Sequence, residues 1–132
     1  MLIGLAVVSL YRACNLSRSF DNLERNAKKV ISGDELQSWA ARLLEEPPAN
    51  ANRRVTDPGV NFPMQMLGLY QQPPTITIQE SNLHSPASIL LSWGSGMMGS
   101  CGFEIGPTNY ISYRPNARAW QPGVYFWSNE PQ

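Results

Sequence analysis

Three side chains are candidates for hydrolytic chemistry: Ser95, His84 and Glu104. Ser95 lies between two glycines, but a strand pattern follows it where a nucleophile elbow requires a helix. His84 is the only histidine, so a catalytic triad or a histidine-based metal site would depend on that residue alone. We therefore keep a small hydrolase, with His84 or Glu104 as the candidate catalytic residue, only as an alternative.

Glu104 is the one charged residue inside its predicted strand, where Phe103 and Ile105 flank it. Side chains alternate along a strand, so the carboxylate is expected to face away from both neighbours. On a solvated face it would be ordinary, whereas under a layer of helices it would be a buried carboxylate and a candidate for function. Glu80 could lie on a neighbouring strand, but no sequence feature fixes the separation that acid and base catalysis requires.

Glycines gather in residues 92–106, which hold five of the ten in the chain. Because glycine permits positive φ and close backbone approach, this stretch suits either a ligand loop or a tight connection between strands. No Gly-Lys-Ser/Thr and no helix follow it, so the requirements of a phosphate loop are missing. We expect a β-hairpin with bent or bulged strands.

The two cysteines, Cys14 and Cys101, lack the spacing of metal ligands, and we expect no metal and no cofactor. They either form a disulfide between the first helix and the glycine-rich stretch or stay free as small buried residues. Ten basic residues balance ten acidic ones. This balance disfavours nucleic acid as a partner, because phosphate contacts need a basic surplus.

Residues 1–11 are apolar on every face. A helix of this length covers only about half of the hydrocarbon core of a bilayer. The segment is therefore the trailing half of an anchor, a helix buried in a partner, or a core helix. From residue 15 to residue 31 the apolar residues form one stripe, which ends at Ala27 and Val30 and predicts an amphipathic continuation of the helix. The residues expected at an interface of this helix are Leu2, Leu5, Val8, Leu16, Phe20 and Leu23.

A second helix is predicted to begin after Ser32, because Ser32 and Glu35 match a capping box, and to end before Pro47. Its apolar face, which includes Trp39, indicates a core helix. Residues 47–60 resemble an exposed linker, and a short third helix is predicted with Pro63 at its first position.

From residue 75 the apolar period changes to two, which predicts strands. Short turns without helices join them, so we expect an antiparallel sheet of about four to five strands with the helices on one face. The predicted fold class is α+β, with residues 1–31 as an anchor or assembly helix and residues 32–132 as one globular domain. The predicted strands are 75–80, 88–93, 101–106, 110–113 and 123–127.

Aromatic residues gather in the last quarter of the chain. Most are expected in the core, but exposed aromatic rings beside arginines would suit a binding surface for a protein or a sugar. The candidate binding residues are Tyr113, Arg114, Arg118 and Trp120.

Four segments carry a resemblance to known proteins: 35–40 (ELQSWA), 93–96 (WGSG), 102–106 (GFEIG) and 120–127 (WQPGVYFW). In this order they resemble a set of small uncharacterised bacterial proteins that have an N-terminal hydrophobic helix and a compact α+β domain. The resemblance implies that architecture and a tether to the cell envelope, and it implies no reaction.

The order of a hydrophobic helix, its amphipathic continuation and an antiparallel sheet also resembles type IV pilins. Pilins carry a glutamate at the fifth mature position, where this chain has Leu5. We expect a non-enzymatic domain of the cell envelope that acts through contacts of its N-terminal helix with a protein partner or with itself, accompanied by membrane contact. A pilin-like filament subunit is the alternative.

Overall fold

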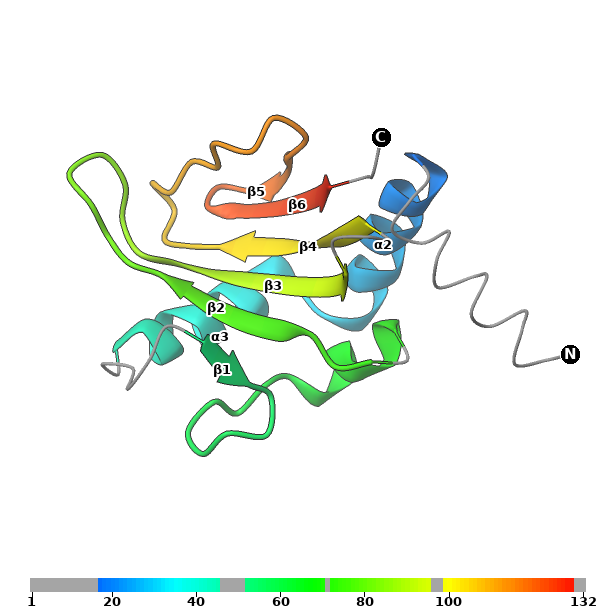
Figure 1. Cartoon of the computed structure of the whole chain (residues 1–132), viewed down its shortest axis with the longest axis horizontal. Helices are drawn as coiled ribbons and strands as arrows, with labels where there is room; N and C mark the ends of the chain where they lie inside the picture. Colours follow the sequence, from blue (N-terminus) through cyan, green and yellow to red (C-terminus); the bar gives the residue numbers. More distant parts are fainter. Residues whose placement is uncertain (1–16, 46–51, 71, 96–98, 130–132) are drawn as a thin grey trace, which may run out of the picture.

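The structure is a computed structural model that describes residues 17–45, 52–70, 72–95 and 99–129 (Figure 1). Two helices come first, α2 (Ser17–Val30) and α3 (Gly33–Glu45), and both lie behind the sheet in the view of Figure 1. A 3-10 helix, η1 (Met64–Leu69), follows them. The strands are β1 (Asn52–Arg54), β2 (Thr75–Gln79), β3 (Ser88–Ser95), β4 (Gly99–Ile105), β5 (Arg118–Gln121) and β6 (Val124–Asn129). The predicted α+β class and antiparallel sheet are confirmed.

The helix cap and the apolar stripe that the sequence predicts can be compared with the two helices. Ser32 Oγ accepts a hydrogen bond from the backbone N–H of Glu35 at 3.0 Å, as the capping pattern predicts. Along α2, Leu23 and Ala27 are buried as expected. Val30 is 39% exposed and Ile31 is buried in its place, so the predicted stripe is wrong at its last position. The helix ends at Val30, and the chain that leaves it turns Ile31 into the core.

The sheet has six strands in the order β1-β2-β3-β4-β6-β5, and every pair is antiparallel. The expected count of four to five strands is too low because two short edge strands were not predicted. β1 forms within the predicted linker 47–60, and β5 forms within a predicted loop. Conversely, the predicted strand 110–113 is a loop in the structure. Edge strands of three or four residues are fixed by pairing with a neighbour, which local patterns do not record.

The core lies between the helices and one face of the sheet. Phe103 on β4 is paired with Leu91 on β3 and with Phe126 on β6, so all three face the same side. The rings of Phe103 and Phe126 lie 5.2 Å apart, and Trp120 stacks on Phe126 at 5.0 Å. The helices supply Trp39 and other buried residues to this layer. This is the arrangement that the alternation of the strands predicts.

Cys101 is buried on the same face of β4 and is disulfide-bonded. Of the two alternatives, the structure therefore has Cys101 in a disulfide and not as a free thiol. Cys14 lies outside the described residues, as do residues 1–16 as a whole. Among the helices that the structure describes, none combines the length and the apolar character that crossing a membrane requires.

The glycine-rich stretch forms the β3–β4 hairpin, as predicted, with the tip at residues 96–98 outside the described residues. Gly94 has a φ of 100°, which favours glycine. At Gly102 a Cβ atom would lie 1.9 Å from the backbone oxygen of Leu91. The two central strands approach too closely at this point for any side chain.

Replacing Gly102 by alanine tests that close approach. We expect Gly102→Ala to lower the free energy of unfolding by about 2–3 kcal/mol, because β3 and β4 must separate locally to admit the methyl group. Gly68 is the matched control, since a Cβ there meets nothing within 4 Å. Gly68→Ala should stay within about 0.5 kcal/mol of the unchanged chain. Urea unfolding of both variants measures the difference, and equal values would contradict the steric explanation.

Candidate functional site

Glu104 on β4 faces away from the helices, as alternation predicts, yet it is only 2% exposed. Its cover is the loop between β4 and β5, residues 107–117, which we call the strap and which runs from yellow to orange in Figure 1. Of the two settings that the sequence left open, a solvated face and a face covered by helices, the structure has neither, because a loop covers Glu104. The strap folds back directly after Gly106, where a Cβ atom would lie 2.6 Å from Cβ of Tyr110.

Three strap residues at alternate positions contact the carboxylate. Tyr110 donates a hydrogen bond to Glu104 Oε2 at 2.5 Å, and the Ser112 hydroxyl donates one to Oε1. The guanidinium of Arg114 forms an ion pair with Oε1, with Nε at 3.2 Å. A single carboxylate thus holds the central part of the strap at three points.

The sheet itself adds a fourth contact. Gln79 on β2 donates a hydrogen bond from Nε2 to Glu104 Oε2 at 3.2 Å, and the same nitrogen lies 3.0 Å from Ser88 Oγ. Each oxygen of the carboxylate therefore has two partners. Because an ionised carboxylate is costly to bury without such partners, this set accounts for its place under the strap.

Aromatic rings complete the site. The guanidinium of Arg114 lies over the ring of Trp127 on β6, 4.9 Å from its centroid, in a cation–π contact. The ring of Tyr110 meets that of Tyr125 edge to face, and the Tyr125 hydroxyl donates to the backbone oxygen of Tyr110 at 3.1 Å. Burial, followed by the hydrogen bond to Glu104, raises the pKa of Tyr110 to about 12.

These contacts make Glu104 an anchor for the strap. General acid or base catalysis needs a carboxylate oxygen that can reach a substrate, and here both oxygens are engaged by protein groups. His84 is exposed in the β2–β3 turn, and its backbone makes two hydrogen bonds: its N–H donates to Asn82 Oδ1 and its oxygen accepts from Tyr113. Within the described chain no hydrogen bond or ion pair joins the His84 ring to Glu104. Glu80 is exposed beyond the end of β2.

The four predicted binding residues divide between the two faces of the sheet. Tyr113 and Arg114 belong to the strap, whereas Trp120 stacks on the core residue Phe126. Arg118 is also on the helix side, where it pairs with Glu24 of α2 at 2.9 Å. The structure therefore does not bring the four together.

Of the predicted interface residues, Leu23 is buried in the core of the chain itself. Leu2, Leu5, Val8 and Leu16 lie outside the described residues, as does the side chain of Phe20. Conversely, sequence reasoning missed Gln79, Ser112 and Tyr110 as partners of Glu104. The available signal was the period of two in 110–114, which places Tyr110, Ser112 and Arg114 on one side of an extended segment.

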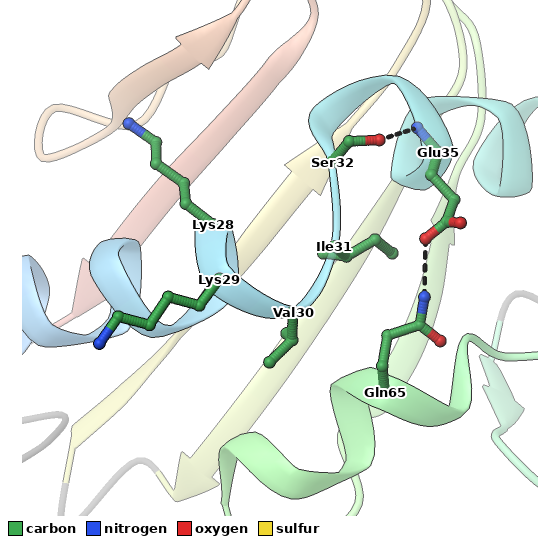
Figure 2. A pocket seen from close by; sticks show the side chains of 7 residues that line it. All are labelled: Lys28, Lys29, Val30, Ile31, Ser32, Glu35 and Gln65. Carbon is green, nitrogen blue, oxygen red and sulfur yellow. Dashed lines mark hydrogen bonds between the residues drawn. The ribbon is translucent and has the colours of Figure 1, made fainter.

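An open hollow of about 420 Å³ lies where α2, α3 and η1 meet (Figure 2). Gln65 donates to Glu35 Oε2 at 2.7 Å, and both lysine chains extend away from this pair in Figure 2. Lys28 is itself paired with Glu24 at 2.9 Å. The polar groups of the hollow are therefore largely matched by neighbours. In the part of the chain that the structure describes, no three metal-ligating side chains gather.

Comparisons with models of protein families, with curated proteins and with solved structures found no match. The resemblance to small bacterial proteins and the weaker one to type IV pilins therefore stay predictions.

Removing the carboxylate should release the strap. We expect Glu104→Ala to lower the free energy of unfolding by about 3 kcal/mol, since it leaves Tyr110, Ser112 and Gln79 without their acceptor. Glu80→Ala, which removes an exposed carboxylate, should change the stability by less than about 0.5 kcal/mol. Denaturant titration of the two variants gives the comparison. Equal losses would show that Glu104 does not anchor the strap.

The raised pKa of Tyr110 makes a prediction for alkaline solution. Between the ordinary tyrosine pKa of about 10 and the folded value, the unfolded chain loses this proton while the folded chain keeps it. The contribution of Tyr110 to the free energy of unfolding is thus fully present below about pH 10. Above that pH it falls by about 1.4 kcal/mol per pH unit. Unfolding free energies of the unchanged chain and of Tyr110→Phe should converge from pH 10 to 12. A constant difference across that range would contradict the prediction.

Proposed function

We propose that this chain is a non-enzymatic domain of the cell envelope that acts through protein contacts and is tethered or assembled through residues 1–31. The observation that carries the proposal is the attachment of α2 to the sheet, because only residues 12–16 separate α2 from the apolar residues 1–11 in the sequence. A helix that is packed against the domain can hold the domain at a fixed distance from such a segment and can transmit force between the two.

The attachment has an apolar and a charged part. Leu23 and Ala27 are buried against the core. On the polar side, Glu24 bonds to Lys28 within the helix and to Arg118 on β5, both at 2.9 Å. The bond from Lys28, and then that from Arg118, lowers the pKa of Glu24. The pair with Arg118 links α2 to the edge strand of the sheet.

Two further observations support the proposal. The engaged oxygens of Glu104 favour a structural role for the one buried carboxylate among the described residues. The disulfide at Cys101 favours an oxidising compartment, because disulfides persist outside the cytosol and in the bacterial periplasm. A secreted or envelope location agrees with both the disulfide and the apolar start of the sequence.

A pilin-like filament subunit is the alternative form of this proposal. In it the N-terminal helices of many copies would pack against one another, so the assembly would grow with concentration. A tethered domain would instead bind a lipid surface or one partner and stop there. The departure at Leu5 from the pilin glutamate favours the tethered form.

Charges placed in the apolar segment should abolish both forms, and the unchanged chain distinguishes them: assembly that grows with concentration indicates a filament, and vesicle binding without such growth indicates a tether. We expect the full chain with Leu5→Asp and Val8→Asp to be monomeric and to lose binding to neutral phosphatidylcholine vesicles, because a carboxylate is costly to bury in lipid or in an apolar interface. Ser38→Asp with Thr56→Asp adds the same charge at two exposed positions and should change neither property. Light scattering and vesicle flotation provide the measurements. An unchanged chain that is already monomeric and leaves vesicles unbound would overturn the proposal.

A further inference from the structure

Residues 110–114 of the strap have the side-chain pattern of a β-strand. Tyr110, Ser112 and Arg114 face inward and contact Glu104. Between them, Ile111 and Tyr113 are 66% and 72% exposed. Alternation of this kind is typical of an extended segment with one covered face. Yet the structure assigns these residues to no strand.

The missing element is a neighbouring strand. Tyr110 accepts a hydrogen bond at its backbone oxygen from Tyr125, and Arg114 donates its N–H to Ser112 Oγ. Between these two ends, the backbone groups of residues 111–113 make no hydrogen bond to any described residue. Such a row of free N–H and C=O groups on an extended segment is a template for pairing with another chain.

We propose that residues 110–114 pair antiparallel with the same residues of a second copy of this chain, across a two-fold axis at Ser112. In that register Ile111 lies opposite Tyr113 of the second copy, and Tyr113 lies opposite its Ile111. Pairs of an aromatic and a β-branched residue stabilise antiparallel strands. The segment is thus complementary to itself, as a two-fold interface requires.

Charge supports a second copy as the occupant. Arg114 is the only charged residue of the strap, and it is already matched by Glu104. Pairing two straps therefore brings no unmatched like charges together. The edge strand β1 is less suitable, because it carries Arg53 and Arg54 and charged side chains on an edge oppose pairing.

The anchor at Glu104 prepares the strap for this contact. Three side chains held by one carboxylate fix the outward direction of Ile111 and Tyr113 before a partner arrives, which reduces the entropy lost on binding. The paired segment is short, so the contact is weak by itself. Copies gathered through residues 1–31 would raise its occupancy through effective concentration, although the pairing does not depend on that assembly.

Cysteine cross-linking tests the register. Residues opposite each other in an antiparallel pair have Cα atoms about 4.5–5.5 Å apart, within the range of a disulfide. Full-length chains carrying Ile111→Cys and Tyr113→Cys are mixed and oxidised, and the dimer is followed by mass spectrometry. We expect the mixed dimer to form about tenfold faster than the dimer of Ile111→Cys with an Asn116→Cys control, because only the first pair is in register.

The same mixture is measured in chains that also carry Leu5→Asp and Val8→Asp, which separates strap pairing from N-terminal assembly. A preference for the mixed pair in that background supports the proposal even where residues 1–31 form no assembly. Equal rates for the mixed pair and the Asn116→Cys control overturn it. Circular dichroism verifies that each variant is folded, which the exposure of the replaced residues favours.

Discussion

The charge of Glu104 is the constraint on which the second face of the sheet depends. A carboxylate near the end of β4 must either reach water or be given donors, and this chain supplies them from a loop that begins three residues later. The strap is thereby folded back over the sheet, and Trp127 becomes buried beneath its arginine. One buried charge thus orders a loop that contains no helix or strand.

Different kinds of interaction stabilise the layers on the two faces of the sheet. On the helix side, burial of apolar side chains such as Phe103 and Leu36 holds the layers together, and the contacts have no strict direction. On the strap side, hydrogen bonds and an ion pair hold each of the three inward-facing side chains to one oxygen of Glu104. The first face provides most of the stability, and the second gives the loop a single conformation.

The elements predicted correctly from the sequence are those with local causes. Ser32 and Glu35 mark a helix start within one turn, and Ile76 and Ile78 mark a strand by their spacing. β1 and β5 depend on strands more than twenty residues away or on a hairpin with a bulge, so no local pattern reveals them. The burial of Glu104 stayed open for the same reason, because its cover comes from a loop that sequence patterns do not place in space. The periodicity in 110–114 was visible, but a strand also needs a neighbour.

The alternation within the strap has a consequence for how its length can change. Gly106 fixes where the chain turns back, and Tyr110, Ser112 and Arg114 then meet Glu104 in phase with a period of two. An insertion of one residue between Gly106 and Tyr110 would exchange the two sides, placing Ile111 and Tyr113 against the carboxylate. An insertion of two residues would restore the phase. Over evolution this loop is therefore expected to vary in length by even numbers of residues, whereas the β2–β3 turn around His84 carries no such restriction.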